Sequence, residues 1–230
     1  MAISRGARAA LVAATLAMCA AALPDLAAAA PLRGTPPDSV AVGASEALSA
    51  WFAYSGGRPS AVQEFSRLRD SVAEAVAARL RLDPTVLRVA WRRADRPHQV
   101  ALMAALSQLG TPYRTNARTP GVGFDCSGLT SWAWAQAGAP IAHQSRTQIR
   151  AAARRTQATA QAGDFVYYPG HVMLYLGVED AIVHASFRGR PVEVAILAKH
   201  RSGRVTYGDP INSAGASTNS RMNRAFAIAQ

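Results

Sequence analysis

The feature that most constrains this fold is a change in the period of the apolar residues near Gly163. Before it, apolar side chains recur at steps of three and four, as in the run from Val62 to Leu80, which is typical of helices. Beyond it, short β-branched and aromatic runs alternate with turn residues, which is typical of strands. Strands are predicted at 164–168, 171–176, 181–186, 192–197 and 205–207. Helices followed by an antiparallel sheet predict an α+β fold.

Start and stop signals divide the helical part into segments. Helices are predicted at 45–54, 62–80 and 84–91, and residues 31–40, rich in Pro and Gly, are predicted to be a linker. Asp83-Pro84 and Asp95-Arg96-Pro97 each place a capping residue near a proline at the start of a helix. We expect residues 36–96 to form a small helical preamble whose apolar stripe packs on the domain that follows.

The first thirty residues have the pattern of a secretory signal peptide. Arg5 and Arg8 precede an apolar run from Ala9 to Leu23, and a small-residue stretch ends near Ala29. An alanine-rich helix of the mature chain is the alternative. We expect export to the cell envelope or the medium, and no later stretch is apolar enough to predict a membrane span.

The chain is basic, with 25 Lys and Arg against 14 Asp and Glu, a formal net charge of +11. A basic exported protein is attracted to anionic envelope polymers as readily as to nucleic acid. No basic run with interleaved aromatic residues and no zinc-knuckle spacing is present, so a nucleic-acid partner is not expected.

Removal of the signal peptide would take Cys19 with it and leave Cys126 as a lone thiol. A lone thiol forms no internal disulfide, so it is a buried inert residue, an intermolecular bridge or a nucleophile. Cys126 follows a glycine-rich loop and begins a predicted helix. The unpaired N–H groups and positive end of a helix favour the thiolate and stabilise an oxyanion, so we expect a lowered thiol pKa.

Two histidines lie on neighbouring predicted strands. If Leu176 pairs with Ala181, Met173 lies opposite His184, and His171 shares a sheet face with His184. His171 could then be the base for Cys126, with His184 fixing its orientation. A zinc site of Cys126, His171 and His184 is the alternative, although no HExxH or CxxC spacing supports it. We therefore expect no metal and no cofactor.

Four segments, in order, resemble the NlpC/P60 family of cell-wall peptidases. Gly123-Phe124-Asp125-Cys126-Ser127-Gly128-Leu129 resembles its nucleophile motif, and Gly110-Thr111-Pro112-Tyr113 resembles an upstream segment. Residues 163–168 with 170–177 resemble the paired strands that carry the base. Residues 182–186 resemble the strand of the third catalytic residue.

The resemblance implies a papain-like domain that hydrolyses amide bonds of peptidoglycan stem peptides, usually between D-glutamate (or its amide) and a diamino acid. It implies Cys126 as nucleophile, His171 as base and His184 as orienting residue. By the same likeness Tyr113 would support the oxyanion, and Asp125 and Ser127 would line the substrate cleft.

Two positions depart from the family pattern and are expected to border that cleft. Arg114 follows Tyr113 where a tryptophan is usual, and Met173 replaces a small residue. A weakly active wall-binding or regulatory module, or an acyltransferase or amidase, is therefore an alternative to an endopeptidase. Self-inhibition by the helical preamble is a further hypothesis. If Cys126 is the nucleophile, Cys126→Ala should lose muropeptide cleavage and His98→Ala should retain it.

The predicted division of the chain has four parts: a signal peptide at 1–30, a linker and helical preamble at 31–96, a catalytic domain at 97–211 and a poorly ordered tail at 212–230.

Overall fold

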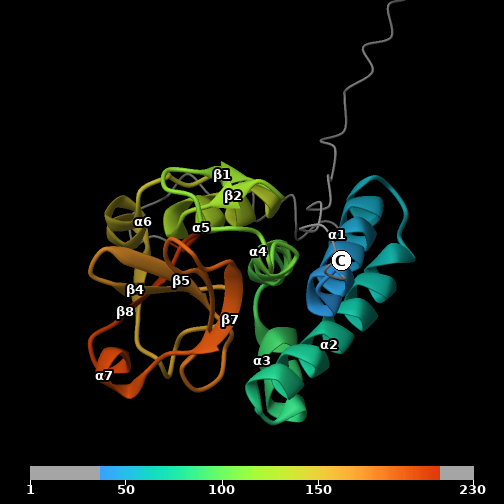
Figure 1. The fold of residues 1–230 in the computed structure, drawn as a ribbon. Helices are drawn as coiled ribbons and strands as arrows, with labels where there is room; N and C mark the ends of the chain where they lie inside the picture. Colours follow the sequence, from blue (N-terminus) through green and yellow to red (C-terminus); the bar gives the residue numbers. More distant parts are fainter. Residues whose placement is uncertain (1–36, 213–230) are drawn as a thin grey trace, which may run out of the picture.

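The computed structural model describes residues 37–212, which form two groups of elements sharing one core (Figure 1). The predicted signal peptide and all but the first residue of the predicted tail lie outside the described residues. Helices in this range are α1 (Ser39–Ser55), α2 (Ala61–Leu80), α3 (Pro84–Arg93), α4 (Arg96–Leu106), α5 (Cys126–Gln136), α6 (Ser145–Ala151) and α7 (Lys199–Ser202). Strands are β1 (Arg118–Thr119), β2 (Gly123–Phe124), β3 (Ala153–Arg155), β4 (Phe165–Tyr168), β5 (His171–Tyr175), β6 (Ala181–Ala185), β7 (Val192–Ile196) and β8 (Thr206–Asp209).

The larger sheet has the order β3-β8-β4-β5-β6-β7, and every neighbouring pair is antiparallel. Helices α4, α5 and α6 lie against it, so the predicted α+β class is confirmed (Figure 1). All five predicted strands are present within one or two residues. The structure adds β3, α6, α7 and the small β1–β2 hairpin, which were not predicted because each is too short to show a period.

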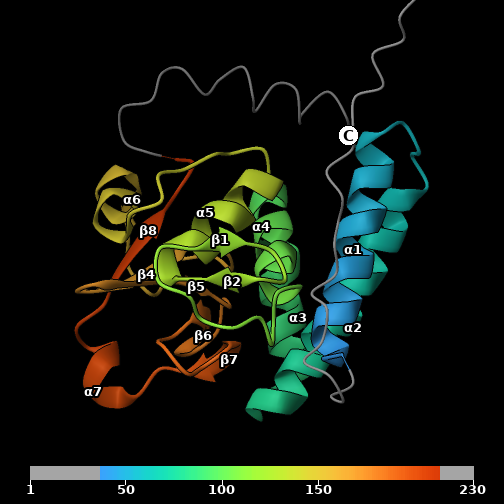
Figure 2. The same ribbon diagram turned by 45° about the horizontal axis from the view of Figure 1, so that its top comes forward.

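The helical preamble consists of α1, α2 and α3, and α1 and α2 lie side by side next to α4 (Figures 1 and 2). Helix α1 begins at Ser39, six residues before the predicted start, so the predicted linker ends too late. The reason is Asp38, whose carboxylate accepts the Val40 N–H at 2.9 Å and also pairs with Arg79 of α2 at 2.7 Å. This cap was overlooked because the surrounding Pro and Gly residues suggested a linker.

The preamble and the sheet share a single hydrophobic core. Phe65 and Trp91 are buried in the same apolar cluster as Leu129 of α5 and Val183 of β6. The indole Nε1 of Trp91 donates to the carbonyl of Leu176 at 2.7 Å, which ties α3 to the end of β5. The apolar stripe of α2 therefore packs on the domain that follows, as expected. Within residues 37–212, no helix combines the length and the apolar character that a membrane span requires.

Candidate active site

Cys126 is the first residue of α5, as predicted, and its thiol is free and partly buried. The backbone N–H groups of Val172, at the start of β5, and of Ser127 are near enough to the sulfur to favour its charged form. The thiol therefore lies between the start of α5 and the beginning of the strand that carries His171.

The two predicted histidines form a hydrogen-bonded pair. His171 Nε2 and His184 Nδ1 are 2.9 Å apart, and their rings meet edge to face. The predicted pairing of β5 with β6 is confirmed, because Leu174 is opposite Val183 and the Leu176 N–H donates to Ala181. The bond uses Nε2 of His171 and leaves Nδ1, on the other side of the ring, for a second partner.

The series of contacts continues one strand further than expected, to Glu193 on β7. His184 Nε2 lies 3.6 Å from Glu193 Oε1, and His184 is directly opposite Glu193 in the β6–β7 register. Glu193 in turn forms an ion pair with Arg190. The alternation along residues 192–197 is the signal that could have pointed to Glu193, but the turn before this strand left its register against His184 open.

Burial dominates the electrostatics of both histidines. It lowers the pKa of His171 to about 3, with His184 and Arg201 adding to the effect, and that of His184 to about 4, with Arg190 and Arg201 contributing. Both imidazoles are therefore neutral near pH 7. Neutral His171 can accept a proton, as a base must.

The pKa of the Cys126 thiol is raised, contrary to the lowered value expected from its place at a helix start. Burial is the largest cause, and the nearby Asp125 carboxylate adds to it. The N–H groups of Val172 and Ser127 act in the opposite direction and do not outweigh them. The resting site therefore pairs a neutral thiol with a neutral imidazole.

Tyr113 lies close enough to the thiol for Cys126 to affect its titration. The pKa of its hydroxyl is raised by burial, and next by Cys126 and Asp125. Its loop is fixed on both sides, since the Tyr113 N–H donates to the Arg190 carbonyl at 3.0 Å and the residue bridges to Phe124. This position is compatible with the oxyanion role that the family resemblance implies.

Asp125 and Ser127 are both occupied in holding α5. Asp125 Oδ1 accepts the Gly128 N–H at 2.6 Å and the Ser127 hydroxyl at 3.1 Å, and lies 3.0 Å from His143 Nε2. Ser127 is 8% exposed. The predicted cleft residues therefore lie beside the nucleophile, with these side-chain contacts directed into the loop and helix.

Of the two departures from the family pattern, only Arg114 lies at a surface hollow. Met173 is 1% exposed and packs with Val166, Tyr175 and Ile182 in a second apolar cluster, so the expectation that it borders the cleft was wrong. The Arg114 side chain lies across Gly123 and lines a groove of about 1350 Å³ between α1, α2 and the 107–122 loop. That lining does not include Cys126, His171 or His184.

Helices α1 and α2 pack chiefly on each other and on α4, α3 and β7. The described part of the preamble therefore gives no support to the self-inhibition hypothesis.

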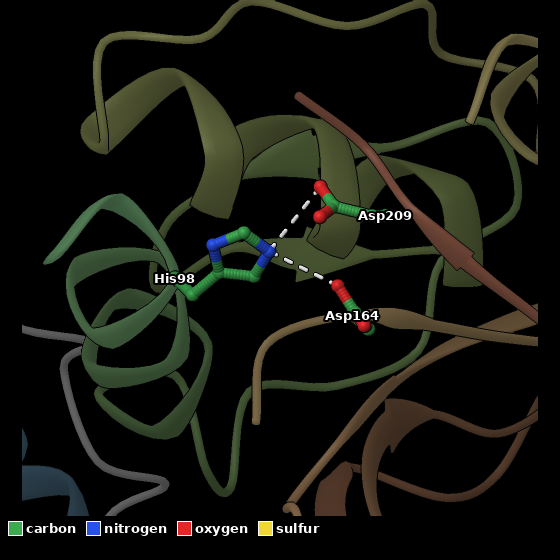
Figure 3. A group of neighbouring side chains, drawn as sticks. All are labelled: His98, Asp164 and Asp209. Carbon is green, nitrogen blue, oxygen red and sulfur yellow. Dashed lines mark hydrogen bonds and ion pairs between the residues drawn. The ribbon is translucent and has the colours of Figure 1, made fainter. Parts of the chain in front are cut away.

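Figure 3 shows a separate buried cluster in which His98 of α4 faces Asp164 and Asp209. Its Nε2 lies 3.0 Å from Asp164 Oδ1 and 3.4 Å from Asp209 Oδ1. Within residues 37–212 it is the one group of such side chains close enough to hold a metal ion together. Its carboxylates already accept N–H donors from Gln161, Arg155 and Asn212.

We therefore interpret the cluster as an ion pair that joins three elements. Although burial lowers the pKa of His98, hydrogen bonds to Asp164 and Asp209 outweigh it and raise the value to about 9. His98→Ala would leave the buried Asp164 carboxylate without its cation and Asp209 with Arg155 alone, so we expect this variant to be less stable.

The comparisons with known proteins match the part of the chain that carries Cys126, His171 and His184. Residues 110–208 match the model of the NlpC/P60 family. The matched segment contains the four motifs, so this similarity agrees with the resemblance read from them.

Named relatives include a "probable endopeptidase" of Mycobacterium tuberculosis, 38% identical over 96 residues, which are 40% of this chain and 24% of the relative. The bifunctional muramidase/DL-endopeptidase CwlT of Bacillus subtilis is 33% identical over 88 residues, 35% of this chain and 27% of CwlT. The match therefore spans about a quarter of each of these two relatives. Among solved structures, the peptidoglycan hydrolase RipB of Mycobacterium tuberculosis aligns over 77% of this chain and 94% of RipB, with 26% identity and a TM-score of 0.43.

Proposed function

We propose that this domain is a cysteine peptidase that hydrolyses amide bonds in peptidoglycan stem peptides. The observation that carries the proposal is the hydrogen-bonded His171–His184 pair beside a thiol at the start of a helix. The relatives named as endopeptidases support the same reaction class.

The reaction would begin with transfer of the Cys126 proton to Nδ1 of His171. The thiolate attacks the substrate carbonyl carbon, and N–H groups at the start of α5, with the Tyr113 hydroxyl, stabilise the oxyanion. His171 then protonates the leaving amine as the C–N bond breaks. A water molecule, deprotonated by His171, hydrolyses the thioester and restores the thiol.

Because the thiol and His171 are both neutral at rest, His184 is needed to stabilise the imidazolium that His171 becomes during the reaction. Forming an imidazolium at a buried position costs energy, and a hydrogen bond from His171 Nε2 to His184 Nδ1 offsets part of that cost. The carboxylate of Glu193, 3.6 Å from His184 Nε2, would favour the tautomer of His184 that accepts this bond. Cys126, His171, His184 and Glu193 thus form one ordered series.

We propose that the enzyme cleaves the bond between D-glutamate, or its amide, and the diamino acid. Export through residues 1–30 would place the enzyme in the cell envelope with this substrate. Both statements rest on sequence patterns, and N-terminal sequencing of the secreted protein would test the second. A mature N-terminus before residue 20 would contradict cleavage near Ala29.

The test is incubation of the purified chain with defined muropeptides and identification of the products by mass. We expect one amide bond of the stem peptide to be cut by the wild type and none by Cys126→Ala. His200→Ala, at an exposed position of α7, is the control that should retain activity. Wall binding without fragment release would favour the binding-module alternative. Transfer to an amine, or a cut at another amide, would favour the acyltransferase or amidase.

A further inference from the structure

Three arginines line a small pocket between α6 and the strands β3, β4 and β8. We propose that this pocket is a subsite that binds a free carboxylate of the peptide substrate. The inference rests on the proposed function and deepens it by naming a chemical preference. The pocket has a volume of about 390 Å³, and its lining includes Arg146, Arg150, Arg154, Ile149, Tyr167 and Thr206.

The three guanidinium groups have no acidic partner in the described part of the chain. None of them forms an ion pair within residues 37–212, whereas Arg155 pairs with Asp209 and Arg190 with Glu193. No acidic residue occurs between Asp125 and Asp164, the stretch that contains all three. Like charges gathered at one hollow repel, and a bound anion relieves that repulsion.

Helix α6 holds two of these arginines in a fixed place relative to the nucleophile. Arg146 and Arg150 are four residues apart and therefore project from the same side of α6. Gln148, 2% exposed, anchors this helix to α5. It donates to the Ser127 carbonyl at 3.0 Å and accepts the Thr130 hydroxyl at 2.8 Å. The helix is thus bonded to the first turn of the Cys126 helix.

Tyr167 relates the pocket to the strand that lies beside the thiol. It lines the pocket and stands opposite Val172 in the β4–β5 register. Directly opposed residues of an antiparallel pair have Cα atoms about 5 Å apart, and the Val172 N–H is near enough to the Cys126 sulfur to lower the pKa of the thiol. An extended peptide advances at most about 3.3–3.6 Å per residue, so we infer that the arginines are within reach of a substrate carboxylate next to the scissile bond.

The chemistry of the pocket selects a carboxylate. A guanidinium group donates two parallel N–H bonds to a carboxylate, and the charge strengthens both. A carboxamide of the same shape carries no charge and offers one acceptor oxygen. We therefore infer that this domain prefers stem peptides whose carboxylate near the cleaved bond is free over those in which it is amidated.

The experiment compares two stem peptides that differ only in one carboxylate or carboxamide adjacent to the cleaved bond. In the wild type we expect kcat/KM to be about tenfold higher for the free acid, as for the loss of one charge-assisted pair. In Arg146→Gln/Arg150→Gln that ratio should fall toward one, with cleavage of the amidated peptide within about twofold of wild type. Arg81→Gln/Arg93→Gln removes the same charge from exposed positions of the preamble and should keep the ratio.

A ratio of one in the wild type, an unchanged ratio in Arg146→Gln/Arg150→Gln, or an equal loss on both peptides would overturn the inference. Loss of binding to poly(glycerol phosphate) in this variant with the peptide ratio unchanged would assign the pocket to a wall phosphodiester polymer instead. If the wild type cleaves neither peptide, the proposed function fails on its own. The affinity of Cys126→Ala for the two peptides, measured by calorimetry, would then test whether the pocket binds the free carboxylate.

Discussion

At the scale of single residues, the central feature is a thiol and an imidazole that are both neutral at rest. Burial raises the pKa of Cys126 and lowers that of His171 to about 3. In the proposed mechanism the thiolate forms once the substrate is in place, when His171 accepts the thiol proton and the helix-start N–H groups stabilise the charge.

Alkylation of Cys126 tests this resting state. Because the thiol pKa lies above its ordinary value, the rate of iodoacetamide labelling in the unliganded protein should be low at pH 7 and rise through pH 9 and above. Quantifying the Cys126 peptide by mass spectrometry gives the rate. A rate that reaches its plateau near neutral pH would show a thiolate–imidazolium pair and contradict the neutral pair.

Glu193 is expected to act through His184. Glu193→Gln removes the carboxylate 3.6 Å from His184 Nε2, so kcat should fall about three- to tenfold with KM nearly unchanged, as expected when an orienting contact is lost. Glu193→Asp should recover part of the rate. Glu46→Gln, which removes an equal charge from α1, serves as the control. An equal decrease in both Gln variants would mean that Glu193 has no specific role.

At the scale of elements, the junction between the 110–125 loop and α5 positions the nucleophile. Gly128 lies against the Ala117 carbonyl so closely that an added Cβ would be 2.0 Å from its oxygen and 3.0 Å from His143 Nε2. This glycine therefore serves close packing, since a side chain could be accommodated only by moving the loop that carries Tyr113 or the helix that carries Cys126.

Gly128→Ala should consequently disturb both stability and activity. We expect a loss of roughly 2–4 kcal/mol in the free energy of unfolding from the forced shift, together with a reduced kcat. Gly203→Ala is the matched control, because Gly203 has φ −70° and no atom near the added Cβ. Denaturant unfolding of the two variants measures the difference. If both variants unfold at the wild-type midpoint, the prediction is wrong, and the loop can move away from the helix without loss of stability.

Much of this element-scale arrangement was predictable, and the exceptions have physical reasons. The strands were predicted because their residues alternate, and the Leu176–Ala181 pairing followed from the turn between them. The position of α6 was missed because its anchor is one buried side chain, Gln148, which no periodicity marks. The placement of Met173 in the second cluster was missed because the family pattern suggested a cleft position, whereas its sheet face packs in the core.

At the scale of the whole molecule, the His98 cluster joins α4 to the start of β4 and the end of β8. Asp164 precedes β4 and Asp209 ends β8, and Arg155 of β3 pairs with Asp209 at 2.8 Å. The sequence did not predict this cluster, because its members are far apart in the chain and each resembles an ordinary polar residue. The cluster thus links α4 to β8, the last strand of the described residues, through the ion pair of His98 with Asp209.

The cluster predicts a particular dependence of stability on pH. The pKa of His98 is about 9 in the folded state and near 6.5 when unfolded, so the folded state binds the proton more tightly. The resulting stabilisation, at most roughly 3 kcal/mol for such a shift, is complete below about pH 6.5 and is lost as the pH rises through 9. Chemical unfolding at pH 6 and pH 9.5 measures it. The same pH difference measured for His98→Gln is subtracted as the background. If the wild type is then as stable at pH 9.5 as at pH 6, or more stable, the ion pair is contradicted.

The intact mass of the protein during muropeptide turnover would show whether Cys126 carries the acyl group. We expect a transient species heavier by the acyl fragment of the cleaved peptide, mapped to Cys126, and neither that species nor any products with Cys126→Ala. An acyl group on another residue, or release of the same products by Cys126→Ala at the wild-type rate, would contradict it.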